Sequence, residues 1–388
     1  MATMDSTFQR YLYKQIDWQN RAICVCGARG VGKTTLMCQY YLNNFDNAEK
    51  ALYLSADNIH VLSQGLLSLA SEYFSLGGEA LLIDEVHKYP DWSIEIKNIL
   101  DTYPKKQIIF SGSAAMELKR SKADLSRRVL YYEMPGLSFR EYLIFIDAIT
   151  LEPMTLNEIL TQHIKLAGKF KTVNVLKLFH DYLKHGYYPY FLENQNSYLV
   201  KLNNVIEKVI MEDIPSTKSI RQGTITQLKK ILWLIATSIC LVPNVDKISK
   251  NLGITREIVY DCLEYLAQSG LTQNVYATGK GMRLIRKPGK IFLDNCNLLY
   301  ALNDQLALES GIGPLRETFF VNQLSTQHAI NVHDSADFLV DNEWIFEVGG
   351  LHKTTEQIKA LQNAYLAVDG IQVGFGNKIP LYLFGCLY

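Results

Sequence analysis

Residues 22–37, "AICVCGARGVGKTTLM", decide the fold of this chain. A short apolar strand runs into Gly27-x-x-x-x-Gly32-Lys33-Thr34 and then into a helical pattern, which is the setting that a phosphate-binding loop requires. The loop glycines let backbone N–H groups crowd around phosphate oxygens, and the helix N-terminus adds partial positive charge. Lys33 is placed to reach the β- and γ-phosphates, and the Thr34 hydroxyl to bind Mg²⁺. We therefore predict an ATP-binding loop made of Gly27, Gly30, Gly32, Lys33, Thr34 and Thr35.

A second motif follows at residues 80–92, "ALLIDEVHKYPDW". Its apolar run ends in Asp84 and Glu85, as expected for a buried parallel strand that delivers acids at its C-terminal end. Asp84 is predicted to hold the Mg²⁺ shell, and Glu85 to polarise the attacking water as general base. Together with the loop upstream, the motif predicts ATP hydrolysis.

The next strand, "QIIFSGSA" at 107–114, ends in small polar residues and is expected between the two strands above. Ser111 and Ser113 at its end are candidates for contact with the γ-phosphate, or they form an ordinary strand-to-helix turn. Arg127 and Arg128 are candidates to stabilise transition-state charge, in cis or from a neighbouring subunit, or they are surface arginines. Downstream, Ser138-x-x-Glu141 predicts a capped helix start.

Length and composition set outer limits. With 388 residues, the chain is too long for one core and suggests two or three domains. Its formal net charge is zero, so any surface for nucleic acid must be local, and no membrane partner is indicated. The N-terminus lacks a signal-like apolar core, and the longest apolar run, 231–242, is too short to span a bilayer. Seven scattered cysteines argue against a disulfide framework, and zinc-ligand spacing is absent. These features favour a reduced, cytoplasmic protein.

The middle of the chain carries no obvious chemistry. Residues 150–205 have an amphipathic helical pattern. Residues 206–290 hold a helix–turn–helix pattern: "VDKISKNLGI" turns at Gly253, and "TREIVYDCLEYLAQSG" is capped by Thr255. Two strands, with the arrangement of a wing, are expected to follow.

Two features of this segment disagree about nucleic acid. Glu257, Asp261 and Glu264 share one face of the second predicted helix, and an exposed acidic face repels phosphates. The predicted wing is basic, with Lys280, Arg283, Arg286, Lys287 and Lys290 close together. Those side chains are suited to grip a nucleic-acid backbone without reading bases. The alternative is a winged helix that packs between domains.

Taken together, "GARGVGKTT", "LLIDEVHKYPDW", "SGSAAMEL…DLSRRV" and "GLSFREYL" resemble prokaryotic AAA-type ATPases with a C-terminal domain of unknown function. The resemblance continues through "GYYPYFLE", "KVIMEDI" and "KIFLDNCNLLYAL" to "ETFFVNQL" and "FEVGG". It implies an α/β fold: a P-loop NTPase parallel sheet with flanking helices, then a winged-helix domain and a small α/β restriction-endonuclease-like domain. The corresponding ranges are 1–205, 206–290 and 291–388.

The last of these modules is expected to begin with a helix at 314–326, followed by three strands up to "EWIFEVGG" and a helix over "TTEQIKALQNAYLAV". This order resembles the core of PD-(D/E)xK nucleases. In that family three acids bind Mg²⁺, which positions water against a phosphodiester. By position, the resemblance assigns those roles to Glu317, Asp337 and Glu347.

The motif departs from the family at Gly349, where the family carries a lysine that helps to orient the nucleophile. Lys353, just beyond, is a candidate for a migrated lysine, and Gln357 and Lys359 are weaker candidates. The other interpretation is a hairpin that keeps the fold and has lost catalysis.

Three functions therefore stand side by side at this point. The first is an ATP-hydrolysing molecular switch that couples its nucleotide state to the C-terminal modules. The second is an ATP-controlled, Mg²⁺-dependent nuclease. The third is a nucleic-acid or protein binding module with a catalytically dead nuclease fold. The oligomeric state, the substrate and the pathway are not indicated by the sequence.

Overall fold

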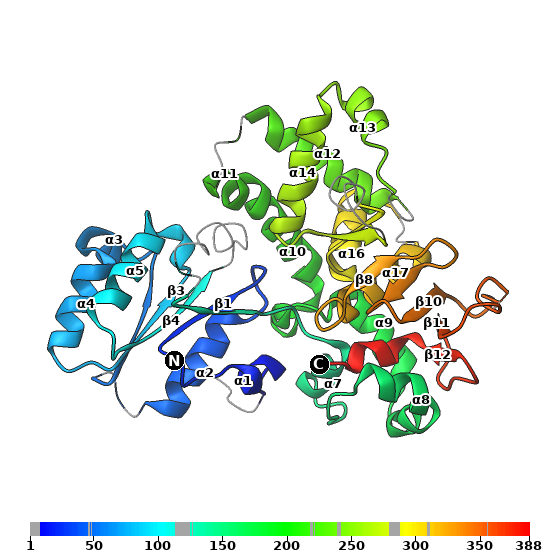
Figure 1. The fold of residues 1–388 in the computed structure, drawn as a ribbon, viewed down its shortest axis with the longest axis horizontal. Helices are drawn as coiled ribbons and strands as arrows, with labels where there is room; N and C mark the ends of the chain where they lie inside the picture. The colour runs from blue at the N-terminus through cyan, green and yellow to red at the C-terminus, as the bar shows by residue number, and fades with distance from the viewer. Residues whose placement is uncertain are drawn as a thin grey trace. The chain divides into compact units, whose positions relative to one another are not determined.

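The computed structural model describes residues 8–45, 47, 49–112, 125, 127–217, 220, 222–238, 242–278, 288–308, 311–354 and 356–388. It divides into two compact units, Met1–Gly136 and Leu137–Tyr388, which we call unit 1 and unit 2 (Figure 1). The helical segment 137–205, which the sequence analysis assigns to the ATPase domain, thus lies in unit 2.

Unit 1 is built on a parallel sheet with strand order β2-β3-β4-β1-β5. The strands are β1 (Ala22–Cys26), β2 (Ala51–Ser55), β3 (Ala80–Asp84), β4 (Gln107–Gly112) and β5 (Leu130–Glu133). Because β3 and β4 are buried on both faces, they consist of nearly continuous apolar runs. The third strand lies between the first two motifs, as expected: β4 pairs with both β1 and β3.

Helices cover both faces of this sheet. They are α1 (Tyr11–Gln15), α2 (Lys33–Asn44), α3 (Ile59–Gln64), α4 (Leu66–Ser75), the 3₁₀ turn η1 (Val86–Lys88) and α5 (Trp92–Thr102). α2 lies on one side, and α3, α4 and α5 lie on the other (Figure 1). Because all strands are parallel, the phosphate loop after β1 and the acids after β3 meet at the same sheet edge.

Unit 2 starts with helices. They are α7 (Phe139–Phe145), α8 (Leu156–Ala167), η2 (Gly168–Phe170), α9 (Val175–His185), η3 (Pro189–Leu192), η4 (Gln195–Ser197), α10 (Tyr198–Lys208), η5 (Val209–Asp213), α11 (Ile214–Thr217) and α12 (Gln222–Thr237). They continue with α13 (Val245–Leu252), α14 (Arg256–Gln268), α16 (Cys296–Gln305), α17 (Ile312–Leu324) and η6 (Leu381–Cys386). The predicted capping box is present, with Ser138 and Glu141 bonding reciprocally at the start of α7. The predicted helix–turn–helix pair is α13 and α14, separated by Gly253 in the left-handed region.

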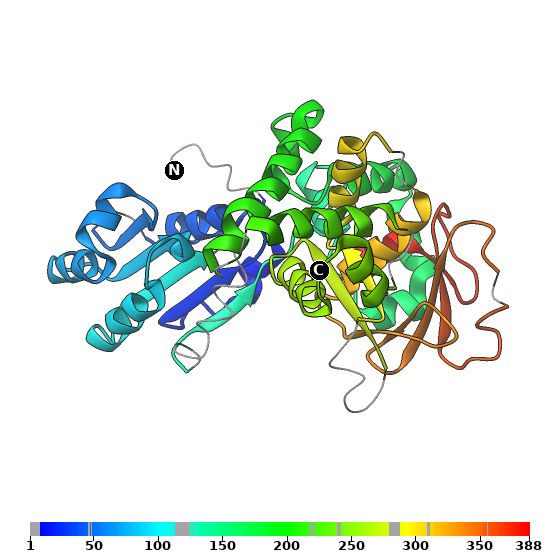
Figure 2. The same ribbon diagram turned by 90° about the horizontal axis from the view of Figure 1, so that it is seen from above.

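A seven-stranded sheet completes unit 2, in the order β12-β11-β10-β9-β8-β6-β7 (Figure 2). Its strands are β6 (Thr272–Ala277), β7 (Lys290–Leu293), β8 (Ile330–Val332), β9 (Phe338–Val340), β10 (Trp344–Gly349), β11 (Ala364–Val368) and β12 (Lys378–Pro380). β8, β9 and β10 form the predicted antiparallel meander. The two strands predicted as a wing, β6 and β7, pair with each other and join this sheet through β8.

The helix predicted over "TTEQIKALQNAYLAV" is wrong. The described residues from 351 to 363 form turns or have no regular structure, and the last five residues form β11. β11 pairs in parallel with β10 and lies inside the sheet, where Leu366 and Ala367 are fully buried. Long-range pairing and burial have overridden the helical preference of this short stretch, as is common for strand positions. Gln357 and Lys359 therefore lie on a turn and not on a helix.

Aromatic packing explains why segment 137–205 belongs to unit 2. The ring of Phe179 lies 5.3 Å from Phe139 and 4.7 Å from Phe319, so α7, α9 and α17 share one core. The buried Asn297 amide donates to the carbonyls of Tyr182 and Leu183 and so links α16 to α9. The contact of Phe179 with Phe319 and those of Asn297 with α9 join residues more than a hundred positions apart, so no local sequence pattern predicts them.

Two further observations concern the described part of the chain. None of its helices combines the length and the apolar character needed to cross a bilayer. The cysteines described there are free thiols: Cys24, Cys26, Cys38, Cys262, Cys296 and Cys386.

Candidate functional site

The phosphate loop joins β1 to α2 and depends on its glycines. A Cβ on Gly27 would overlap the carbonyl oxygen of Met134, which directly follows β5. Only glycine therefore fits where the loop passes the end of β5. Gly32 has a φ of 103°, which a side chain disfavours, and it forms the N-cap of α2. The helix begins at Lys33, and its free N–H groups therefore face the loop. This is the geometry that binds an anion.

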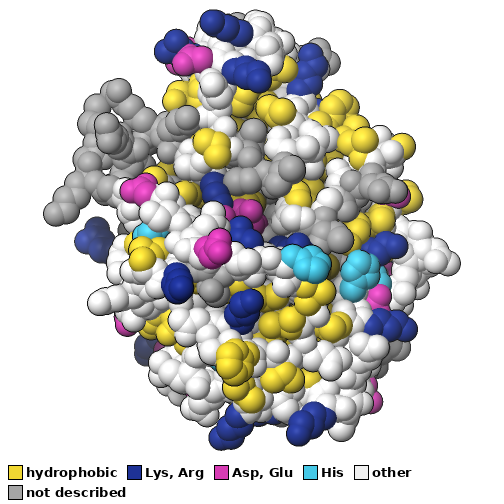
Figure 3. All heavy atoms as spheres, turned by 90° about the vertical axis from the view of Figure 1, so that its right-hand side faces the viewer, with side chains coloured by type: hydrophobic (Ala, Val, Ile, Leu, Met, Phe, Trp, Pro, Cys, Tyr) yellow, Lys and Arg dark blue, Asp and Glu magenta, His cyan; other side chains and the backbone are white. Residues whose placement is uncertain are grey.

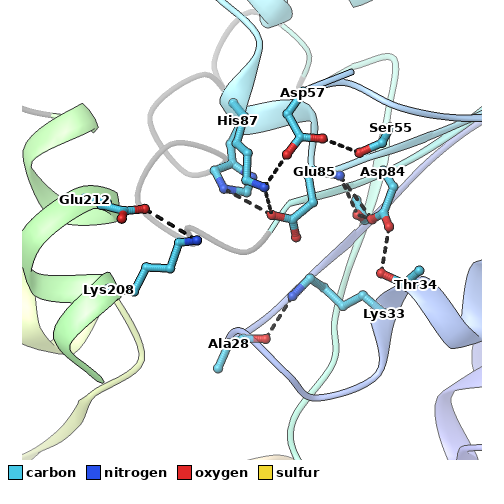
Figure 4. A network of polar contacts seen from close by, with 12 residues as sticks. Ala28, Lys33, Thr34, Ser55, Asp57, Asp84, Glu85, His87, Lys208 and Glu212 are labelled. Carbon is cyan, nitrogen blue, oxygen red and sulfur yellow. Dashed lines mark hydrogen bonds and ion pairs between the residues drawn. The ribbon is translucent and has the colours of Figure 1, made fainter. Parts of the chain in front are cut away.

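Lys33 is folded back onto this loop (Figure 4). Its Nζ donates to the carbonyl oxygens of Gly27 at 3.0 Å and Ala28 at 2.8 Å, and the residue is 5% exposed. Burial lowers the pKa of Lys33 to about 8, although the charges of Glu85 and Asp84 oppose this shift. An arriving phosphate offers the ammonium a stronger, charged acceptor than these carbonyl groups.

Three hydroxyl groups surround Asp84 at the end of β3. Thr34 Oγ1 donates to Oδ2 at 2.6 Å, and the Tyr53 hydroxyl donates to the same oxygen at 2.8 Å. The Ser111 hydroxyl donates to Oδ1, and the backbone N–H of Glu85 donates to both Oδ1 and Ser111 Oγ. Sequence reasoning missed Tyr53 because the neighbour of β3 is known only once the strand order is known. The carboxylate is thus oriented by neutral donors.

Glu85, the predicted general base, has a left-handed backbone conformation with φ 52°. Non-glycine residues rarely adopt this conformation, and it often marks functional sites. Its carboxylate lies 3.2 Å from Lys88 Nζ, and the same ammonium lies 2.6 Å from Asp57. His87 Nε2 is 3.9 Å from the same Glu85 oxygen. Lys88 therefore divides its charge between a surface acid and the candidate base.

The residues of this edge fit a nucleotide with Mg²⁺. Mg²⁺ prefers oxygen ligands, and a hydroxyl and a carboxylate already touch through Thr34 and Asp84. The loop supplies backbone N–H groups, and Lys33 supplies a buried cation. Ser111 is directed to Asp84, whereas Ser113 lies outside the described residues.

A buried arginine that sequence reasoning missed binds backbone carbonyl groups of the phosphate loop and of the segment after β5. Arg10, which is 5% exposed, donates to the carbonyl oxygens of Val31 at 2.6 Å and of Pro135 and Gly136 at 2.8 Å. It thereby ties the phosphate loop to the end of unit 1. An arginine ahead of the first strand has no motif that would reveal this role.

The two arginines predicted near the transition state differ in their surroundings. Arg128 is bound by two nitrogens to Asp101 of α5, at 2.9 Å and 3.2 Å. Arg127 is exposed on the turn before β5. Their roles in catalysis stay predictions.

In unit 2, the three acids of the nuclease-like motif lie close together with two lysines. Lys290 Nζ of β7 lies 3.0 Å from both Glu317 Oε2 and Asp337 Oδ1. Lys353 Nζ lies 2.5 Å from Glu347 Oε1. Asp337 also accepts a hydrogen bond from the backbone N–H of Val348 at 2.9 Å. We call these five side chains the lysine–carboxylate cluster: Lys290, Glu317, Asp337, Glu347 and Lys353.

The cluster explains Gly349. A Cβ at this position would lie 2.7 Å from both Cβ and Cγ of Lys353, so the stem of that lysine occupies the space of the missing side chain. The predicted migrated lysine is therefore in contact with the motif glutamate. Burial lowers the pKa of Lys353, but the hydrogen bond to Glu347 and the charges of the nearby acids outweigh burial, so the pKa is raised.

A divalent ion does not fit this cluster as the structure has it. Among the described residues, no group of three or more His, Cys, Asp or Glu side chains is arranged to hold a metal ion. One oxygen of Glu317 and one oxygen of Asp337 are bridged by the Lys290 ammonium instead. The three acids of the predicted metal site, Glu317, Asp337 and Glu347, therefore lie close together, but each of them contacts a lysine.

The nucleic-acid prediction rests on residues of which four lie outside the described part of the chain: Lys280, Arg283, Arg286 and Lys287. Lys290, the fifth, is turned inward to two carboxylates. Glu257, Asp261 and Glu264 are exposed on α14, so the predicted acidic face is confirmed. On the face shown in Figure 3, the described Lys and Arg side chains are scattered among apolar and uncharged groups.

Comparison with known families now adds to this geometry. Residues 19–143 match a family model described as an AAA domain. That range contains the phosphate loop, Asp84 and Glu85. The match supports an AAA-type ATPase. Residues 176–309 match a model described as a domain of unknown function (DUF8612).

Individual relatives are distant. An uncharacterized protein of Methanocaldococcus jannaschii, MJ1637, is 27% identical over 283 residues, covering 69% of this chain and 59% of that protein. The chain thus spans less than two thirds of that relative's length. The Walker-type ATPase PABY2304 of Pyrococcus abyssi aligns with TM-score 0.44 and 14% identity over 76% of this chain and 96% of its own. The AMPPCP-bound DnaA from Aquifex aeolicus aligns with TM-score 0.28 and 16% identity over 66% and 84%.

Proposed function

We propose that this protein is an ATP-hydrolysing molecular switch whose nucleotide state is coupled to its C-terminal modules. The observation that carries the proposal is the direct contact between the Thr34 hydroxyl and Asp84 beneath a glycine-lined loop at a helix N-terminus. A hydroxyl and a carboxylate paired in this way are the two protein groups that place Mg²⁺ next to bound phosphates.

The chain's own groups have separate roles in this proposal. Thr34 and Asp84 would hold Mg²⁺, which when bound neutralises phosphate charge. Lys33 leaves the loop carbonyls and binds the terminal phosphates through its ammonium. Glu85 accepts a proton from the attacking water, and Ser111 keeps Asp84 oriented.

Two substitutions test the proposal. Lys33→Ala is expected to abolish nucleotide binding, because it removes the buried cation. Glu85→Gln is expected to keep ATP bound and to lower turnover by about 10²–10⁴-fold, the usual contribution of a general base. Glu79→Gln, at an exposed acid paired with Lys50 in the same unit, is the matched control and should be neutral. Equal ATP hydrolysis by wild type and Glu85→Gln would rule out this mechanism.

For unit 2, we infer a binding module with a nuclease-derived fold as the second candidate function. The observation in its favour is that each of the three motif acids is paired with a lysine, which leaves the cluster without the open metal site that a nuclease needs. The competing prediction is an ATP-controlled nuclease, with Lys353 in place of the family lysine.

Incubation with single- and double-stranded DNA and RNA, with Mg²⁺ or Mn²⁺ and with or without ATP, separates these candidates. We expect no cleavage. Cleavage that disappears in Asp337→Ala would establish the nuclease, and cleavage that persists would point to a contaminant. Salt-dependent DNA binding that is lost on neutralising Arg286 and Lys287 would identify nucleic acid as the partner, and its absence at low salt favours a protein.

A further inference from the structure

The most unexpected feature of unit 2 is the position of Lys290. Its ammonium lies 3.0 Å from one oxygen of Glu317 and 3.0 Å from one oxygen of Asp337. The three side chains are 13%, 17% and 18% exposed, so the contact is largely shielded from water. A cation that bridges two acids in this way occupies the position that a metal ion occupies between the carboxylates of a metal site.

Both the backbone and the side chain of Lys290 are held in position by neighbouring elements. Lys290 starts β7 and pairs with Val275 of β6. The preceding Gly289 passes so close to β8 that a Cβ there would lie 2.9 Å from Val332 Cγ2. The ammonium also lies 4.8 Å from the centre of the buried Phe338 ring, which favours a cation at this point. Several elements thus direct one positive charge to one place.

The charges around this point are nearly balanced without an added ion. Three cationic side chains face four acidic ones in a connected region: Lys290, Arg316 and Lys353 with Glu317, Asp337, Glu347 and Asp369. Arg316 lies over Gly350 as Lys353 lies over Gly349, so both glycines make room for a cationic side chain. Burial raises the pKa of Glu317, and the charges of Asp337 and Glu347 add to this effect, although Lys290 opposes it.

We propose that the Lys290 ammonium is a built-in replacement for the divalent cation of a nuclease-like centre, and that removing it turns Glu317 and Asp337, the two acids that it bridges, into a divalent-cation site. A divalent ion entering the wild-type protein has to displace Lys290, which leaves a shielded ammonium without its partners. Such an unpaired charge is costly. The wild-type cluster is therefore closed to metal. This proposal does not depend on ATP hydrolysis in unit 1.

Binding of Mn²⁺ to the full-length chain, measured by the loss of the electron paramagnetic resonance signal of free Mn²⁺, tests the proposal. Every protein in the series carries Asp84→Asn, which removes the proposed cation ligand at the end of β3 in unit 1, and no nucleotide is added. The test variant is Lys290→Met, and Lys290→Gln serves in its place if the first variant does not fold. Lys201→Met, at an exposed lysine of unit 2 paired with Glu193, is the matched control.

We expect no saturable site in the reference protein or in the Lys201→Met control. Lys290→Met should gain one site with a Kd of about 0.1–1 mM, the range of weakly built carboxylate sites. Adding Glu317→Gln to Lys290→Met should remove that site. The new site should also raise the melting temperature of Lys290→Met when Mn²⁺ is added, because the ion binds only the folded chain.

Two results would overturn the proposal. One is a Mn²⁺ site in the reference protein that Glu317→Gln removes, since the wild-type cluster would then be open to metal. The other is the absence of a site in both Lys290 variants, since the acids would then form no latent cation site. Either result leaves the ATPase proposal untouched, because nucleotide binding and turnover are measured separately.

Discussion

The carboxylates in the two acidic centres of this protein have different partners. In unit 1, Asp84 accepts hydrogen bonds from the hydroxyls of Thr34, Tyr53 and Ser111. In unit 2, Glu317 and Asp337 share the ammonium of Lys290, and Glu347 pairs with Lys353. Hydroxyl donors orient a carboxylate and leave its charge available to a cation, whereas an ammonium cancels that charge. The partners of an acid therefore tell more about its function than the acid itself.

Among the variants that test this difference between the two centres, removal of Asp84 is expected to have the largest effect. Asp84→Ala takes away the one acceptor that three hydroxyls share and the carboxylate that Mg²⁺ needs. We expect the affinity for ATP in the presence of Mg²⁺ to fall by about 100-fold or more, since hydrogen bonds to charged groups are worth about 1.5–3 kcal/mol each. Titration with a fluorescent ATP analogue measures the effect.

The control for that titration is Asp101→Ala, which removes an exposed acid bonded to Arg128 in the same unit. It should leave the affinity within about twofold of wild type, because exposed ion pairs contribute little. An equal loss of affinity in both variants would show that Asp84 matters only for folding.

The next prediction concerns the glycine that makes room for Lys353. Gly349→Ala is expected to lower the free energy of unfolding by about 1–3 kcal/mol, because the new methyl group overlaps the lysine stem. In a Lys353→Gly background the same change should cost much less, since nothing then fills the space. Urea unfolding of the four proteins of this double-mutant cycle gives the coupling energy. If the two changes in the free energy of unfolding were additive, the stem of Lys353 would not be the reason why position 349 requires glycine.

The sequence predicts unit 1 better than unit 2, for a physical reason. The phosphate loop, Asp84 and Glu85 lie on contiguous motifs whose local geometry is set by glycines and by a buried strand. Their neighbours Tyr53 and Arg10 come from other segments and follow only from the strand order and the packing. In unit 2 the motif acids were found, but the lysine that reaches two of them lies on a distant strand.

Local pattern also failed where long-range pairing decides structure. The stretch that ends in β11 has helix-forming residues, yet its last five residues form a strand that lies between β10 and β12. The spacing of the basic residues at 280–290 predicts that Lys290 belongs to a basic surface. Its backbone pairing with Val275 and the nearby acids turn it inward instead. Neither outcome can be read from spacing alone.

A smaller effect is expected at Tyr53. Tyr53→Phe removes only the hydroxyl that donates to Asp84 at 2.8 Å and keeps the ring. We expect kcat/KM for ATP to fall by up to about tenfold, which corresponds to about 1.4 kcal/mol. Steady-state kinetics measure this change. Tyr132→Phe, which removes a hydroxyl bonded to the backbone of Asp17, is the control and should be silent. A loss in the control of the same size would mean that tyrosine hydroxyls matter here only for stability.

The smallest expected effect concerns Lys88, whose ammonium contacts Glu85 in unit 1. It is the sharpest test of the difference between hydroxyl and ammonium partners, because here an ammonium contacts an acid of the candidate ATP site. Lys88 lies between Asp57 at 2.6 Å and Glu85 at 3.2 Å, so its ammonium competes with the attacking water for the Glu85 carboxylate. Lys88→Met should therefore raise kcat by about two- to fivefold, the size of a partly exposed ion pair. Asp57→Asn should lower kcat by a similar factor, since Lys88 then pairs with Glu85 alone. Lys50→Met, at an exposed pair with Glu79, should change nothing. If both variants shifted kcat in the same direction, Lys88 would be acting on the fold of the turn and not on the charge of the base.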